Sequence, residues 1–247
     1  MTTWVDHLGE LAIRAPAGLR RRARFARAAV LAAVRAPRAA TRREVARAGL
    51  RQLPLTGLVG LALGVLVVGQ AVALLRQVSA HQYIGTVMVT VVLRELGPLL
   101  VAFLVAARSG PALVVELGTH ETQEHWLREL VGPRVRALAV TVPCLTIYLI
   151  AIALGSGYLV AFLQGVPLRW QVYTGQLANA VHWLDFGLIG LKAILFGVVI
   201  GVVSCYHGWV QTLRIEELPG ATTRAVVESM ALCVLLDVVF LVGYFGR

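Results

Sequence analysis

The chain is poor in charged residues, in cysteine and in lysine. Charged residues make up 15% of its 247 residues, against about a quarter in typical soluble domains, while 58% are hydrophobic and the mean hydropathy is +0.76. The three cysteines, Cys144, Cys205 and Cys233, lie within or beside apolar runs, where cysteine commonly packs as a small hydrophobic residue. This usage predicts neither a disulfide framework nor a metal site, and the composition is typical of a chain embedded in lipid.

The sequence also lacks the motifs of common enzymes and ATPases. It contains no GxxxxGK[ST] phosphate-binding loop, no GxSxG, no HExxH and no convincing pair of catalytic carboxylates. His120 and His125 are five positions apart, about 140° from alignment on a helix, whereas a zinc-binding pair needs a spacing of four. We therefore expect no enzyme activity, metal or bound cofactor, and the energy for any active transport must come from another chain.

Long apolar runs make up most of the chain after residue 51. Five runs are near the roughly 20 residues that a helix needs to cross a bilayer, at about residues 54–75, 86–107, 135–162, 188–206 and 226–245. They predict an all-α integral membrane protein with one transmembrane domain over residues 52–247. In the first run, Gly60 and Gly64 have a spacing that allows close helix packing.

Arginine is concentrated before the first apolar run. Twelve of the 23 basic residues precede Pro54, and apolar residues such as Phe25 and Leu31 are interleaved with them. A nucleic-acid-binding arm is one interpretation, but beside membrane spans the positive-inside rule and attraction to anionic headgroups explain the arginines more simply. We predict Arg-rich amphipathic helices in the membrane interface over residues 1–51, broken at Pro16 and Pro37, with no nucleic-acid partner.

The arginines between the runs predict the orientation of the chain. The connections after the second and fourth runs are the richer ones, with Arg108, Arg128, Arg134, Arg136, Arg214 and Arg224 at their edges. The positive-inside rule makes these connections cytoplasmic. A cytoplasmic N-terminus and five crossings then leave the C-terminus on the far side. The connection over residues 164–187 is rich in aromatic residues and could form a short helix at the outer interface.

The second run has two adjacent charges in its apolar middle. Arg94 and Glu95 would each be costly if they faced lipid, so they should face protein or water. Adjacent helix residues point about 100° apart, so the two should contact different neighbours. They could form buried ionic links that hold the helices together, or line a substrate cavity, which we favour because intramembrane charge marks functional sites. Gly97 and Pro98 should loosen or kink the helix there.

Further charges lie in the fourth and fifth runs. Asp237 is in the middle of the fifth run and needs a partner, such as a hydroxyl, an arginine or water. Its role could be structural or functional. Asp185 and Lys192, the only lysine, bracket the beginning of the fourth run.

The connection between the second and third runs is polar and compatible with a helix. Residues 116–130 read ELGTHETQEHWLREL, in which Thr119 or Thr122 could cap a short helix. We interpret this segment as a helix that docks a soluble partner, with a solvated loop as the alternative.

Two motifs resemble the MlaE/YrbE permeases, the membrane subunits of MCE-associated ABC transporters. Residues 93–119, LRELGPLLVAFLVAARSGPALVVELGT, are similar to the family's LRELGP, A-G-R-x-G and E-[LI]-G elements. Residues 220–229, GATTRAVVES, followed by LLDVVF, are similar to its C-terminal element. The resemblance covers about residues 50–246 and includes the five-span layout.

The resemblance implies a permease of the bacterial inner membrane with a cytoplasmic N-terminus and a periplasmic C-terminus. Its partners would be a second permease copy, a cytoplasmic ABC ATPase that uses the ATP, and a periplasmic MCE-domain protein, and its cargo would be phospholipid or another lipid. Our candidates for the lipid cavity are Arg94, Glu95, Leu96, Gly97, Pro98 and Asp237. Our candidates for coupling to the ATPase are Glu116, Gly118, Thr119, Glu121, Glu124, Trp126 and Arg128.

The segment after ELGT departs from the family pattern. It reads HETQEHWLRELVGPR, without the T-E-Q-I-x-A-L and D-P elements, and A-R-S-G stands where A-G-R-x-G is usual. A membrane scaffold or assembly subunit that does not itself transport lipid is therefore the alternative function. An intramembrane enzyme is disfavoured because no paired catalytic groups are present.

Overall fold

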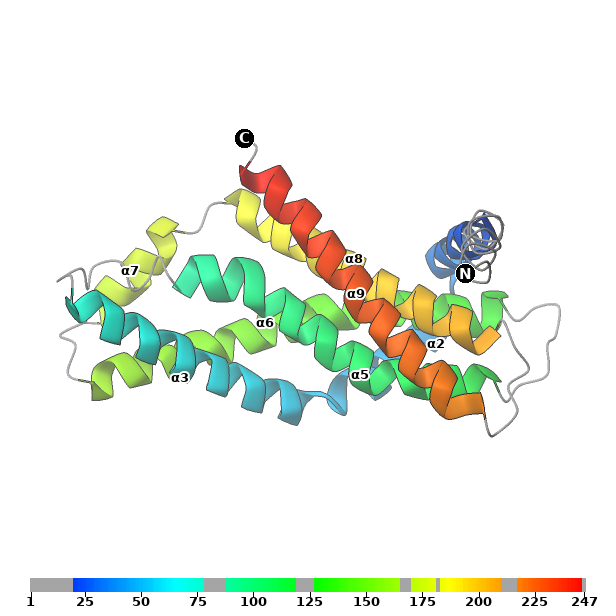
Figure 1. Cartoon of the computed structure of the whole chain (residues 1–247), viewed down its shortest axis with the longest axis horizontal. Helices are drawn as coiled ribbons and strands as arrows, with labels where there is room; N and C mark the ends of the chain where they lie inside the picture. The colour runs from blue at the N-terminus through cyan, green and yellow to red at the C-terminus, as the bar shows by residue number, and fades with distance from the viewer. Residues whose placement is uncertain are drawn as a thin grey trace, which may run out of the picture.

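The computed structural model describes residues 20–77, 88–118, 127–164, 170–180, 183–209 and 217–245, and within these ranges all regular structure is helical (Figure 1). A helix over residues 20–35 comes first. The next elements are α2 (Arg38–Leu50), α3 (Leu53–Gln77), η2 (Met88–Leu96), α5 (Gly97–Gly118), η3 (Leu127–Val131), α6 (Gly132–Leu163), α7 (Trp170–Ala180), α8 (Trp183–Trp209) and α9 (Leu218–Phe245). The predicted all-α class is confirmed.

Five helical segments are long and apolar enough to cross a membrane, as predicted. They cover Leu53–Ala71, Val91–Gly118, Glu129–Leu163, Asp185–Trp209 and Leu218–Gly243. The predicted limits were wrong in places, since the second span continues past residue 107 and the third and fifth begin earlier. Charged residues ended these runs in the sequence, but α5 continues beyond the exposed Arg108, and the buried Arg134 in α6 is paired with Glu116.

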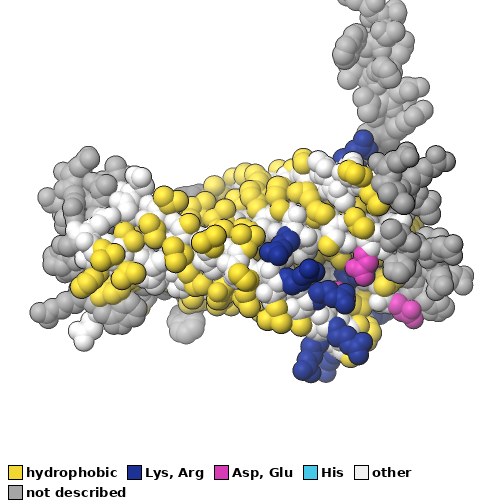
Figure 2. Space-filling model, turned by 90° about the horizontal axis from the view of Figure 1, so that it is seen from below, with side chains coloured by type: hydrophobic (Ala, Val, Ile, Leu, Met, Phe, Trp, Pro, Cys, Tyr) yellow, Lys and Arg dark blue, Asp and Glu magenta, His cyan; other side chains and the backbone are white. Residues whose placement is uncertain are grey.

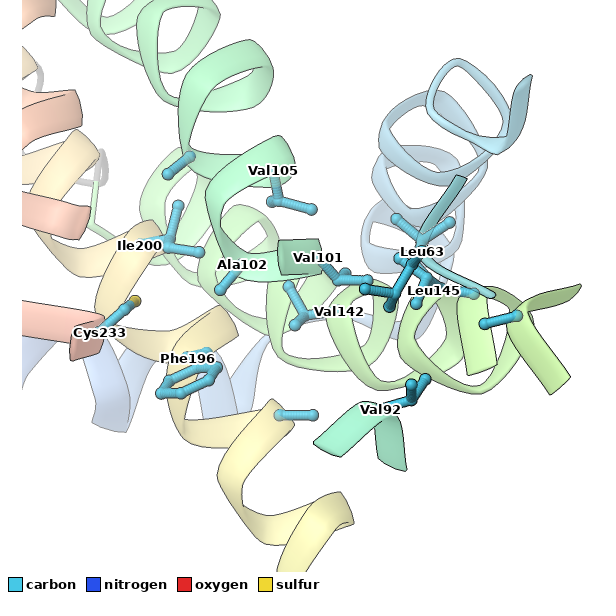
Figure 3. Close-up of a cluster of buried hydrophobic side chains, with 14 of the residues drawn as sticks. Leu63, Val92, Val101, Ala102, Val105, Val142, Leu145, Phe196, Ile200 and Cys233 are labelled. Carbon is cyan, nitrogen blue, oxygen red and sulfur yellow. The ribbon is translucent and has the colours of Figure 1, made fainter. Parts of the chain in front are cut away.

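The longest helix, α6, is the centre of the bundle. It has 32 residues and contacts α2, α3, α5 and α8, while α9 packs against α5 and α8. Side chains from η2, α3, α5, α6, α8 and α9 form the main core, including Leu63, Val92, Val101, Val142, Phe196 and Cys233 (Figure 3).

Close packing of α3 against α6 depends on the two glycines noted in the sequence. A Cβ atom at Gly60 would lie 2.9 Å from the Leu149 carbonyl oxygen. At Gly64 it would clash with the Ala153 carbonyl and the Ser156 hydroxyl. The prediction that these glycines serve helix packing is therefore confirmed.

Two helices precede the first span, and they are separated at Pro37 as predicted. The first of them, over residues 20–35, contacts the end of α8, where Phe25 stacks on Trp209 with 5.2 Å between ring centroids. The predicted break at Pro16 lies outside the described residues. In Figure 1, α7 lies at the left end of the bundle, and α2 lies in its right half.

The predicted short helix before the fourth span is α7. Its Tyr173 side chain is buried, and the phenol donates a hydrogen bond to the Leu154 carbonyl oxygen of α6 at 3.2 Å. Burial raises the pKa of Tyr173 to about 12, so the phenol keeps its proton. This contact anchors α7 to the bundle.

Candidate functional site

The charged pair of the second span lies in a stretch of π-helix. Arg94 and Glu95 are near the end of η2, and the chain returns to α-helix at Gly97. A Cβ at Gly97 would lie 2.6 Å from the Val92 carbonyl oxygen, so a larger residue would not fit without a shift. Pro98 has no N–H to donate to the carbonyl of Arg94 four residues earlier. The ammonium of Lys192 donates to that carbonyl instead, at 3.1 Å.

Arg94 and Glu95 contact different partners, as their adjacent positions predicted. Arg94 Nη2 donates to Asp185 Oδ2 at 2.8 Å, and Lys192 Nζ donates to Glu95 Oε2 at 3.1 Å. Lys192 Nζ also lies 2.5 Å from Asp237 Oδ1. We call these five residues the ionic network, which connects η2, α8 and α9.

Asp237 pairs with a residue type that we did not predict. We expected a hydroxyl, an arginine or water, and the structure places Lys192 there. Asp185 and Lys192 were seen in the sequence only as isolated charges. The signal that could have identified them is that every charge within a span needs a partner.

The ionic network is mostly shielded from solvent. The Lys192 side chain is 5% exposed and that of Asp185 is 4% exposed, whereas that of Glu95 is 34% exposed. Two cations and three carboxylates leave an excess of one negative charge. Ion pairs buried to this degree offset a large loss of hydration, so removing one member leaves its partner with an unfavourable buried charge.

An apolar cavity of about 610 Å³ lies beside the network. Leu93, Phe186 and Ala193, which line it, are the chain neighbours of Arg94, Asp185 and Lys192. The six lipid-cavity candidates and the ionic network are not among its lining residues, so these charges lie next to the cavity and do not form its wall. The opposite wall comes from α6 and the end of α7, with Ile150, Leu154 and Ala178. Its volume is within the range of about 300–1,000 Å³ that is common for small-molecule sites. Polar groups next to an apolar cavity suit an amphiphilic ligand.

The remaining lipid-cavity candidates lie at the junction of η2 and α5. Leu96 is half-buried, and Gly97 and Pro98 are buried. They shape the backbone that presents Arg94 and Glu95.

Most coupling candidates are at or beyond the end of α5. Glu116 forms an ion pair with Arg134, and Gly118 is the last residue of the helix. Thr119, Glu121, Glu124 and Trp126 lie outside the described residues, and Arg128 is in η3, with its side chain not described. Because α5 has 22 residues, it separates this segment from the network by about 33 Å.

Among the described residues, no group of three or more His, Cys, Asp or Glu side chains is placed so that it could hold a metal ion. His120 and His125 lie outside the described residues.

These features define a multi-pass helical membrane protein with ionised side chains and an apolar cavity between its spans. The family model described as Permease MlaE matches residues 41–242. The chain therefore belongs to the MlaE permease family, as the two sequence motifs indicated.

Three relatives illustrate the range of this similarity. A probable ABC transporter permease protein of Rickettsia felis is 32% identical over 76% of each chain. The intermembrane phospholipid transport system permease protein MlaE of Haemophilus influenzae is 31% identical over 80% of each chain. The chloroplastic protein TRIGALACTOSYLDIACYLGLYCEROL 1 of Arabidopsis thaliana is 26% identical over 83% of this chain and 61% of its own length.

Proposed function

We propose that the chain is the membrane-spanning subunit of an ATP-driven transporter that moves phospholipid or a related lipid. Membership of a permease family supports this role, and it agrees with a chain that has no ATP-binding motif of its own. The name of the Haemophilus influenzae relative refers to phospholipid transport. A separate ABC ATPase would then bind and hydrolyse the ATP.

The observation that carries the proposal is the position of the ionic network beside the apolar cavity. The cavity walls suit acyl chains, and a zwitterionic or anionic headgroup needs charged partners. Glu95 is one third exposed while its partner Lys192 is buried, so their contact is the one that a headgroup can reach first. Glu95 would pair with the ammonium group of a zwitterionic headgroup, so replacing Glu95 would remove a charge-assisted contact to the transported lipid.

Helix α5 would couple the ATPase to the ionic network, because it extends from one to the other. Its first residue adjoins the ionic network, and its last turn carries Glu116, at the start of the segment that we propose docks the ATPase. A helix is stiff along its axis, so a displacement at Gly118 would reach Gly97 about 30 Å away. Gly97 adjoins the π-helical turn, where the helical geometry changes.

The orientation and the remaining partners belong to the same proposal. The end of the bundle that carries α2, Arg108, Arg134 and Arg136 would face the cytoplasm under the positive-inside rule, and the C-terminus would face the periplasm. A second permease copy and a periplasmic MCE-domain protein would complete the complex in the bacterial inner membrane. The exposed apolar face of α9, with Leu235 and Val239, offers a surface that lipid or the second copy would cover.

The test is lipid transfer by the reconstituted complex of this chain with its ATPase. Replacing Glu95 with leucine should lower ATP-dependent transfer of a fluorescent phospholipid on the order of tenfold, as expected for the loss of one charge-assisted contact. Assembly with the ATPase should not change. The matched control is Glu217→Leu, an exposed carboxylate outside the network.

Unchanged transfer by Glu95→Leu would argue strongly against this cavity. A complex that assembles but shows no ATP-dependent transfer even with the native sequence would favour the scaffold function. The departure of the segment after ELGT from the family pattern is the observation that supports this second candidate.

A further inference from the structure

A second cavity lies beside the C-terminal half of α5, away from the ionic network. It has a volume of about 300 Å³, and its walls come from α2, the turn before α3, α5 and α6. Its charged lining residues are Glu44, Arg47, Arg51, Arg108, Glu116 and Arg134, and we call this cavity the arginine pocket. Arg94 and Arg108 are fourteen positions apart, so the two sites are about 20 Å apart along the helix axis.

The arginine pocket has an excess of positive charge. Four arginines face two glutamates, which leaves two positive charges uncompensated. Glu116 is paired with Arg134, and Glu44 accepts a bond from Arg47 at 3.4 Å. Arg51 and Arg108 have no ion pair within the described part of the chain. An anion with one or two charges would balance the pocket.

The base of the pocket contains polar atoms with unmet hydrogen-bonding capacity. The Arg134 side chain is 5% exposed, and its Nη1 has no hydrogen-bond partner among the described residues. Gln52 is 1% exposed, and its Nε2 donates to Ser109 Oγ at 2.7 Å. Its Oε1 has no partner within the same ranges. Buried polar atoms are normally satisfied, so a ligand with a phosphate and a hydroxyl or ammonium group would complement both residues.

The surroundings of the pocket indicate where such a phosphate comes from. The first span begins at Leu53, directly after Gln52, and Arg108 lies within the span Val91–Gly118. Leu50, the residue before Arg51, and Leu58 of α3 are exposed and apolar. Figure 2 shows Lys and Arg side chains gathered toward one end of a face that is otherwise largely hydrophobic. This is the arrangement expected at the depth of lipid headgroups.

We propose that the arginine pocket binds the phosphate of an anionic phospholipid from the adjoining leaflet, with Arg51 and Arg108 as its ligands. Arginine pairs well with phosphate because its donors match two phosphate oxygens. Arg134 and Gln52 form the base, and the acyl chains lie against the apolar surface beside α3. This lipid is separate from the transported lipid, and the site does not depend on the proposed transport function.

The test is native mass spectrometry of the full chain from detergent micelles that contain phosphatidylglycerol and phosphatidylcholine. The double variant Arg51→Gln, Arg108→Gln should retain phosphatidylglycerol on the order of tenfold less tightly, because it loses charged hydrogen-bond donors. The matched control is Arg38→Gln, Arg43→Gln, which removes two exposed charges from α2 outside the pocket. It should retain the lipid as the native chain does.

Equal retention by all three proteins would overturn the proposal, and so would an equal loss in both double variants, which would indicate general surface attraction. Titration of inorganic phosphate into the lipid-free protein, followed by calorimetry, separates the two sources of phosphate. Phosphate binding that disappears in the pocket variant, with unchanged lipid retention, would overturn the lipid as ligand. If the double variant does not fold, the single variant Arg51→Gln should show the same direction of effect, and unchanged retention by it would overturn the proposal.

Discussion

Replacing Lys192 with methionine tests the ionic network most directly. Methionine keeps an unbranched chain of similar length but removes the charge and all donors. Three contacts are lost: those to the Arg94 carbonyl, to Glu95 and to Asp237. Because Lys192 is the shared partner, two carboxylates lose their cation at once.

The structure allows the size of the effect to be worked out. Polar contacts between helices in membranes average about 0.6 kcal/mol each, so three contacts give about 2 kcal/mol. Removing one partner of a fully buried ion pair costs about 3–5 kcal/mol. Glu95 is 34% exposed and can be hydrated, whereas Asp237 is 14% exposed and cannot be hydrated fully. We therefore expect a loss of about 2–3 kcal/mol in the free energy of unfolding. This is at least the sum of three average contacts between membrane helices and at most the lower part of the range for a fully buried ion pair.

The measurement is equilibrium unfolding of the purified chain in mixed detergent micelles. Arg38→Met, an exposed change on α2, is the control and should lie within about 0.5 kcal/mol of the native chain. Adding Asp237→Leu to Lys192→Met removes the orphaned carboxylate and should recover part of the loss. If Lys192→Met unfolds like Arg38→Met, or if the second substitution recovers nothing, the reasoning about the network is wrong.

Three further substitutions test other parts of the structure. Gly64→Val should destabilise the bundle by about 1–3 kcal/mol through overpacking of α3 against α6, whereas Gly243→Ala, where a Cβ meets open space, should be neutral in the same unfolding assay. Ile189→Trp should fill the apolar cavity and lower phospholipid transfer without changing the yield of folded protein, and unaltered transfer would place the lipid elsewhere. Tyr173→Phe should lose about 1 kcal/mol with the hydrogen bond to Leu154, and equal melting of both proteins would show that this contact does not anchor α7.

The spans were predictable because hydropathy is a property of each segment alone. The five apolar runs correspond to five helices, although the charged residues near their ends made some of the predicted limits wrong. Arg108 interrupts an apolar run but not the helix, since its side chain reaches the arginine pocket while Leu113 and Leu117 remain buried on the same helix. A sequence window cannot show that a charge has a partner on another helix.

In the candidate site, the residue types alone predicted that Arg94, Glu95 and Asp237 should not face lipid, because the cost of dehydrating a charge does not depend on the fold. Helix geometry also predicted that Arg94 and Glu95 would contact different neighbours, because it separates adjacent side chains. The pairing of Lys192 with both Glu95 and Asp237, and of Arg134 with Glu116, could not be predicted in this way and became known from the packed helices. Those pairings depend on how α5, α6, α8 and α9 are rotated and packed against one another, and no local pattern of residues encodes that rotation.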